Sequence, residues 1–248
     1  MDKTLQRATE ALTLDTAVIL TTSGVFGGPF TDPTRSVGPV GPLMRVGGLS
    51  LLQRAVLTLQ RAGLSQMVIL AGDEEEALRR MLRQDPRVTS VLRWRPVHEF
   101  PPQDLRTWET LANELRGPCL VVGTHAVFAR GLVERLREEV RNGQAAILVS
   151  HPADQAREGC PLNPTVQLNA DRLVALQDSP SGDGAPNMAA DMVVLPAHLL
   201  GAVGVSARGP GAGSRGAQGS AAESLDQVLA QGRVRKAPLR ILIERAAA

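Results

Sequence analysis

The sequence has no tyrosine, and aromatic residues make up only 2% of its 248 residues. This shortage argues against a protein that binds single-stranded nucleic acid on aromatic stacking platforms, and against a membrane protein with Trp and Tyr belts. Only two of the 27 basic residues are lysines, and 25 acidic residues leave a formal net charge of +2. A nearly balanced charge creates no strong field that would attract a polyanion. Nucleic acid is therefore not expected as a partner.

Cysteines and long apolar segments are equally scarce. The two cysteines, Cys119 and Cys160, suggest neither a disulfide framework nor a cysteine zinc site, which favours a reducing compartment. All apolar runs are far shorter than the roughly 20 residues that cross a bilayer. Residues 1–16 contain no apolar targeting core. The sequence therefore predicts a cytoplasmic protein without a membrane span.

Short apolar runs alternate with amphipathic segments along most of the chain. Strands are predicted where β-branched and other apolar residues are concentrated, at 17–20, 67–71, 119–122, 145–149 and 192–195. Helices are predicted where apolar residues recur at helical spacing, at 49–63, 73–84, 104–115 and 132–141. This alternation predicts an α/β fold of the three-layer, Rossmann-like type, in which helices flank a mostly parallel sheet.

Two later segments depart from this alternation. Residues 165–178 are interpreted as two short strands joined by a turn at 169–171, which forms a small β-hairpin insertion. Residues 201–220 are dominated by Gly, Ala, Ser and Arg, a composition that predicts a disordered loop. The predicted organisation is an N-terminal extension (1–16), an α/β domain (17–200), this loop, and a helix and strand that complete the same domain (221–248).

The loop after the first predicted strand is long and rich in glycine. It has seven glycines from Gly24 to Gly48, and in an open parallel sheet ligands bind beyond the carboxyl ends of the strands. A glycine backbone approaches a phosphate closely and adopts positive φ. We therefore predict that Ser23, Gly24, Gly27 and Gly28 contact a phosphate-bearing ligand. The alternative is a connecting loop without a ligand, since no fixed glycine spacing supports the first interpretation.

Three motifs, taken in order, carry a resemblance to a known family. They are AVILTTSG (17–24), GPLMRVGGLSLL (41–52) and GPCLVVGTH (117–125). Over residues 17–200 the chain resembles the nucleoside-triphosphate transferases that make sugar-nucleotides and CDP-alcohols, as a divergent relative of the MobA-like group. The resemblance implies a nucleotide-diphospho-sugar transferase fold. It also implies transfer of a nucleotidyl group from a nucleoside triphosphate to a phosphorylated sugar or polyol, with Mg²⁺ as cofactor.

The resemblance also locates the positions that would hold phosphates. The family's lysine before Pro-Leu falls on Gly41. Arg35 and Arg45 are then the catalytic candidates, because a guanidinium group offsets phosphate charge, although it presents a planar fork where lysine presents a point charge. The alternative is that both are solvated loop arginines.

The turn after the strand at 119–122 corresponds to the family's aspartate-bearing turn. The metal-binding aspartate of the family falls on Thr124, and a neutral hydroxyl does not replace a carboxylate that binds Mg²⁺. Thr124 and His125 are candidates for nucleotide binding at this turn. Asp191 is the carboxylate candidate for a metal, with a simple turn or cap role as the alternative.

Two hypotheses of function remain open at this point. The first is an active nucleotidyltransferase, which the strand and loop motifs favour. The second is a catalytically inactive binding or regulatory module with a protein partner such as an active relative, which Gly41 and Thr124 favour. A glycosyltransferase of similar fold would need a D-x-D metal motif, and the sequence has none at a strand end.

Overall fold

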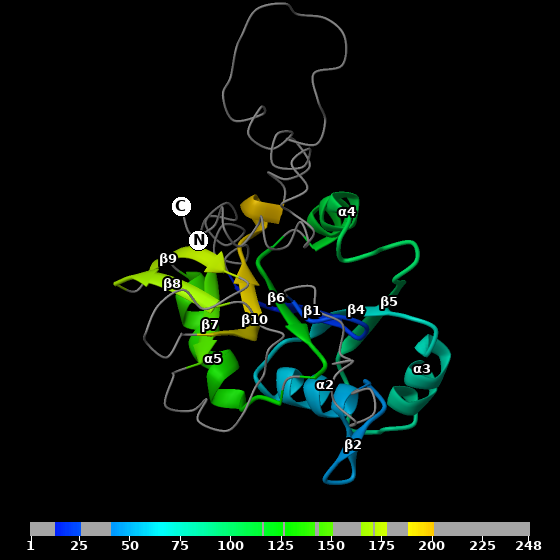
Figure 1. Cartoon of the computed structure of the whole chain (residues 1–248). Helices are drawn as coiled ribbons and strands as arrows, with labels where there is room; N and C mark the ends of the chain where they lie inside the picture. Colours follow the sequence, from blue (N-terminus) through cyan, green and yellow to red (C-terminus); the bar gives the residue numbers. More distant parts are fainter. Residues whose placement is uncertain are drawn as a thin grey trace, which may run out of the picture.

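The computed structural model is shown in Figure 1. It describes residues 13–25, 41–115, 117–125, 127–141, 144–150, 165–170, 172–177 and 188–200. The predicted loop at 201–220, the predicted C-terminal helix and strand and most of the N-terminal extension lie outside the described residues. No helix among the described residues is long and apolar enough to cross a membrane.

The parallel half of the sheet consists of four strands, of which three were predicted and the one at 91–96 was not. They are β1 (Thr16–Leu20), β4 (Gln66–Ala71), β5 (Val91–Pro96) and β6 (Cys119–Gly123). Their order is β5-β4-β1-β6, with β1 paired in parallel to both β4 and β6. Parallel neighbours joined by helices are the predicted βαβ units, so the predicted fold class is confirmed.

The other half of the sheet is antiparallel. Strand β10 (Met188–Leu195) runs against β6 and also pairs with β7 (Ala146–Ser150). Strands β8 (Thr165–Asn169) and β9 (Arg172–Gln177) form the predicted hairpin, which joins β10 at Met188. Ala170 in its turn has a φ of 53°, a left-handed value that fits the predicted turn position.

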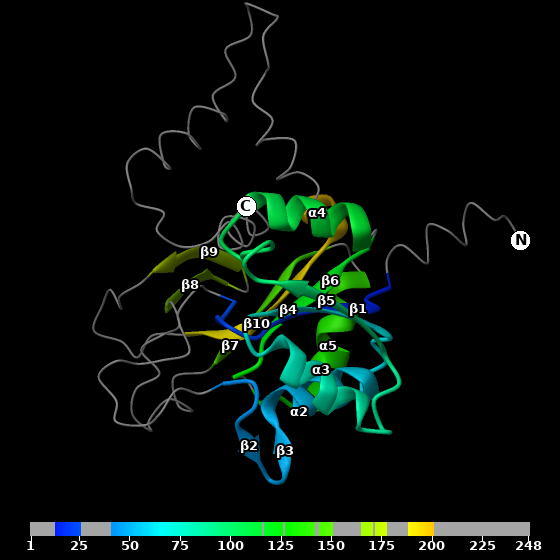
Figure 2. The same ribbon diagram turned by 90° about the vertical axis from the view of Figure 1, so that its right-hand side faces the viewer.

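Helices cover both faces of the sheet, as Figure 2 shows. One face carries α2 (Leu51–Arg61), α3 (Glu75–Arg83) and α5 (Arg130–Arg141), and the other carries α4 (Leu105–Leu115). Strand β1 supplies both cores by alternation: Ala17 and Ile19 pack with α2, α3 and α5, while Val18 and Leu20 pack with Trp108 of α4. The sheet is thus the middle layer of three, as predicted.

A short hairpin fixes the start of α2. Strands β2 (Arg45–Val46) and β3 (Leu49–Ser50) pair across Gly47 and Gly48, which both have positive φ. Ser50 caps α2, because its hydroxyl accepts from the Gln53 amide while the Gln53 side chain accepts from the Ser50 amide. The Leu51 and Leu52 amides donate to carbonyls of the same segment. The first amides of α2 are therefore all used within the fold.

Candidate functional site

Polar side chains gather where β1 and β6 end side by side. The Thr124 amide donates to the Leu20 carbonyl at 3.0 Å, so the turn after β6 lies against the exit of β1. Ser23, Thr124 and Asp191 are only 6%, 1% and 3% exposed. In the part of the chain that the structure describes, the Ser23 and Thr124 hydroxyls are buried without a hydrogen-bond partner. Unsatisfied buried hydroxyls are uncommon in cores and mark places where a ligand or water binds.

Asp191 reaches this place through the register of β10 against β6. The two strands pair as far as Met192 and Val122, which brings Asp191 level with Gly123 at the end of β6. By strand alternation its side chain shares a face of β10 with Ala189 and Val193 of the core under α4. Its Oδ1 accepts a short hydrogen bond from the Val25 amide at the exit of β1.

Two glycines make room for this carboxylate. A Cβ atom on Gly123 would lie 1.7 Å from Asp191 Oδ2, and one on Gly24 would lie 2.9 Å from Asp191 Oδ1. No side chain fits at such distances unless the Asp191 carboxylate moves, so packing favours glycine at Gly123 strongly and at Gly24 less strongly. Gly24 thus has a structural role beside the predicted contact with phosphate, which stays a prediction.

His125 completes the group. Its Nδ1 lies 3.3 Å from Asp191 Oδ2. Burial raises the pKa of Asp191 to about 7, against the opposing effect of the Val25 and Gly123 amides. Burial also lowers the pKa of His125 to about 4. Between these values Asp191 is protonated and His125 is neutral, so the two groups together hold one proton.

The described residues do not fit a resident Mg²⁺ ion. Mg²⁺ requires hard oxygen ligands in octahedral geometry, and Asp191 is the single carboxylate of this cluster, with both oxygens already close to amide or imidazole N–H groups. Among the described residues no group of three His, Cys, Asp or Glu side chains is arranged to hold a metal. The role of Mg²⁺ therefore remains an expectation that only the resemblance carries.

The structure brings together only part of the predicted site. Ser23, Gly24, Thr124, His125 and Asp191 form one cluster, to which we refer below as the Asp191 cluster. Two further predicted glycines and one arginine lie outside the described residues, namely Gly27, Gly28 and Arg35.

Arg45, the other predicted catalytic residue, is exposed on the β2–β3 hairpin and lines a different pocket. Gly41 has no other atom within 4 Å of where a Cβ would stand. The sequence signal for Asp191 was an acid at the start of an apolar strand. No signal predicted its contact with His125, since that depends on the register of β10 against β6.

No protein-family model matches the chain, and no curated protein matches its sequence. Solved structures do match its fold. The inositol-1-phosphate CTP transferase of T. maritima has a TM-score of 0.55 at 14% identity, over 89% of this chain and 83% of that one. For CMP:2-keto-3-deoxy-manno-octonic acid synthetase complexed with CTP the values are 0.54 and 14%, over 88% and 86%. HddC of Yersinia pseudotuberculosis gives 0.55 and 12%, over 76% and 80%.

At these identities the similarity shows the fold and not the activity. The predicted nucleotide-diphospho-sugar transferase fold is thereby confirmed. None of these structures distinguishes the MobA-like group from other nucleotidyltransferases.

Gly123→Ala is expected to destabilise the protein, because the new methyl group overlaps the Asp191 carboxylate. Overpacking of this kind costs roughly 1–3 kcal/mol of unfolding free energy, and more where nothing moves aside. Adding Asp191→Ala should recover part of that loss, since it removes the overlapping group. Urea denaturation of the single and double variants measures the coupling.

Gly131→Ala is the matched control, because a Cβ on Gly131 meets no atom within 4 Å. It should leave the urea midpoint unchanged or raise it. Equal effects of Gly123→Ala with and without Asp191 would contradict the packing described above.

The Asp191–His125 pair also predicts a pH dependence of stability. In Asp191→Asn, His125 loses the neighbouring carboxyl group and keeps a folded pKa of about 4, below its ordinary 6.5, so the unfolded chain binds the extra proton. Stability should then rise with pH between about 4 and 6.5. In His125→Gln, Asp191 has a folded pKa of about 7, above its ordinary 3.8, so the folded chain holds the extra proton. Stability should then fall as pH rises through the same window.

In the unchanged protein the two slopes oppose each other, because folded and unfolded chains each hold one proton on the pair across this window. Urea denaturation of all three proteins at several pH values gives the slopes. Slopes of stability against pH that have the same sign in the two variants would refute the opposite pKa shifts of Asp191 and His125.

Proposed function

We propose that the protein is a nucleotidyltransferase that transfers a nucleotidyl group from a nucleoside triphosphate to a phosphorylated sugar or polyol. The observation that carries the proposal is the cluster of buried, unsatisfied hydroxyls at the carboxyl ends of β1 and β6. In open α/β sheets this edge is where ligands bind. The similarity of fold to a CTP transferase and to a synthetase complexed with CTP supports it.

The proposed reaction is an in-line displacement. An oxygen of the acceptor phosphate forms a bond to the α-phosphorus, and the bond from that phosphorus to the pyrophosphate oxygen breaks. The Ser23 and Thr124 hydroxyls are suited to donate hydrogen bonds to phosphate oxygens. The Gly24 backbone stands beside them without a side chain. Mg²⁺ bound with the triphosphate would supply charge neutralisation, and Arg35 remains a predicted phosphate contact. Arg45, the other arginine predicted for this role, lines a pocket that shares no residue with the Asp191 cluster.

A second candidate is a non-catalytic module that keeps the fold to bind a nucleotide or a protein partner. It is favoured by Gly41 and Thr124, which occupy the positions where the family that this chain resembles has lysine and aspartate. The Asp191 cluster moreover offers one carboxylate, which burial holds partly protonated near neutral pH. Under either candidate we propose a cytoplasmic location, with which the free, buried thiol of Cys119 agrees. We also propose that the protein is related to the MobA-like group.

Calorimetric titration with ATP, GTP, CTP and UTP in the presence of Mg²⁺ tests nucleotide binding, which the transferase and a nucleotide-binding module have in common. Binding of at least one triphosphate is expected, and weakening of that binding by Ser23→Ala would place it at the Asp191 cluster. Release of pyrophosphate with inositol 1-phosphate or glucose 1-phosphate then separates the candidates. Turnover supports the enzyme, and binding without turnover supports the module. Binding of no triphosphate at millimolar concentration would rule out the transferase.

Gly41→Lys is expected to tighten triphosphate binding about tenfold, because one charge-assisted hydrogen bond is worth roughly 1.5–3 kcal/mol. The open space around Gly41 admits the longer side chain. Gly131→Lys on α5 is the matched control, since it adds the same charge at an equally open position. Equal effects of the two lysines would mean that only net charge matters, and would contradict a phosphate position at Gly41.

A further inference from the structure

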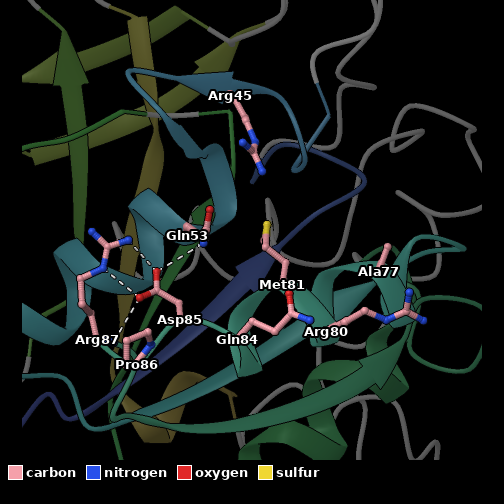
Figure 3. Close-up of a pocket in the computed structure, with 9 residues that line it drawn as sticks. All are labelled: Arg45, Gln53, Ala77, Arg80, Met81, Gln84, Asp85, Pro86 and Arg87. Atoms are coloured by element: carbon pink, nitrogen blue, oxygen red, sulfur yellow. Dashed lines mark hydrogen bonds and ion pairs between the residues drawn. The ribbon is translucent and has the colours of Figure 1, made fainter.

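A pocket of about 530 Å³ lies between the β2–β3 hairpin, the first turn of α2 and the helix α3 (Figure 3). Its volume is in the range of sites for small organic ligands. None of its lining residues belongs to the Asp191 cluster. The lining residues are Arg45, Gln53, Ala77, Arg80, Met81, Gln84, Asp85, Pro86 and Arg87.

The charge of the pocket is predominantly positive. Three arginines and a single acid line it. Figure 3 shows the Arg45 side chain pointing from the hairpin into the pocket, and the Arg80 side chain pointing outward along the rim on α3. Among the described residues no carboxylate is paired with Arg45 or with Arg80. Both guanidinium groups are therefore available to an anion, Arg45 as it stands and Arg80 after a change of rotamer.

The single acid, Asp85, is already neutralised. Its two carboxylate oxygens accept from Arg87 Nε at 2.8 Å and from Arg87 Nη2 at 2.7 Å. These hydrogen bonds lower the pKa of Asp85 to about 2, so it stays ionised and holds Arg87 in place. Arg87 Nη1 takes no part in this pair. The Asp85–Arg87 pair, which forms the floor of the pocket, thus repels an anion less than an unpaired Asp85 carboxylate would.

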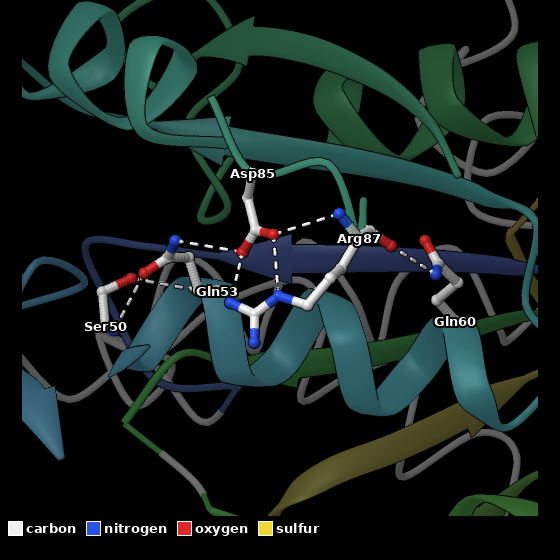
Figure 4. A network of polar contacts seen from close by, with 5 residues as sticks. All are labelled: Ser50, Gln53, Gln60, Asp85 and Arg87. Atoms are coloured by element: carbon white, nitrogen blue, oxygen red, sulfur yellow. Dashed lines mark hydrogen bonds and ion pairs between the residues drawn. The ribbon is translucent and has the colours of Figure 1, made fainter. Parts of the chain in front are cut away.

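A network of hydrogen bonds keeps this floor in position (Figure 4). The Gln53 amide group donates to Asp85 at 3.3 Å, while its oxygen accepts from the Ser50 amide at the cap of α2. Gln60, two turns further along the same face of α2, accepts from the Thr89 amide and donates to the Arg87 carbonyl. Side chains fixed in this way lose little entropy when a ligand binds.

We propose that this pocket binds a small organic phosphate, with the phosphate group held by Arg45, Arg80 turning in from the rim to contact it, and the organic part lying on Met81 and Pro86. A guanidinium fork matches phosphate geometry, and the apolar surface of Met81, Ala77 and Pro86 suits an organic group rather than a bare ion. Gln53 and Gln84 supply amide groups for hydroxyls. The inference rests on the pocket alone and holds whether or not the Asp191 cluster transfers nucleotides.

Calorimetric titration of the full chain with ribose 5-phosphate, AMP and inorganic phosphate tests the proposal. Ribose 5-phosphate or AMP should bind at least tenfold more tightly than inorganic phosphate. Arg45→Ala and Arg80→Ala should each weaken that binding about tenfold, as the loss of a charge-assisted hydrogen bond predicts. Arg83→Ala is the matched control, because Arg83 is exposed on the same helix outside the pocket. It should leave the binding unchanged.

Asp85→Asn provides a test in the opposite direction. It removes the acid and releases Arg87, so binding of the same phosphate should tighten severalfold, with circular dichroism confirming the fold.

Three results would overturn the proposal: no binding of either organic phosphate, equal weakening by Arg45→Ala and Arg83→Ala, or loss of binding in Ser23→Ala with none in Arg45→Ala. The last would place the ligand at the Asp191 cluster.

Discussion

The edge of the sheet where function is expected depends on one buried carboxylate. Asp191 holds the end of β1 through the Val25 amide and stands against the end of β6, where Gly123 leaves space for it. It therefore connects a parallel strand pair to the antiparallel strand β10. An uncompensated charge in such a place is costly, and the raised pKa of Asp191 and its contact with His125 show how that cost is limited.

Much of the fold was predictable from the sequence. Apolar runs such as Ala17–Leu20 and the amphipathic segment at 49–63 have periods that belong to strands and helices, and these periods result from local geometry. The hairpin at 165–178 was predictable for the same reason. The structure places the corresponding β1, α2, β8 and β9 there. These elements pack as expected because each has one or two clearly apolar faces.

The candidate site was predictable only where it follows a strand end. Ser23, Gly24 and Thr124 lie at carboxyl ends, and parallel pairing alone brings them to one edge. The part played by Asp191 was not predictable, because the antiparallel register that sets Asp191 beside Gly123 is a property of strand pairing and leaves no periodic signal. The pocket between α2 and α3 was missed for a related reason. Asp85 and Arg87 occupy a turn after α3, and only tertiary packing shows that they face Gln53 and Arg45.

Thr124 and Asp191 are best understood together. An aspartate in place of Thr124 would stand one residue from Gly123, beside a carboxylate that is already buried. Two carboxylates that close would raise each other's pKa and could not both stay ionised without a cation. Among the described residues this edge has one acid, Asp191 from β10, and a neutral hydroxyl at the turn. Its charge is therefore limited by burial, which raises the pKa of Asp191 to about 7, and no second carboxylate of the described residues adds to it.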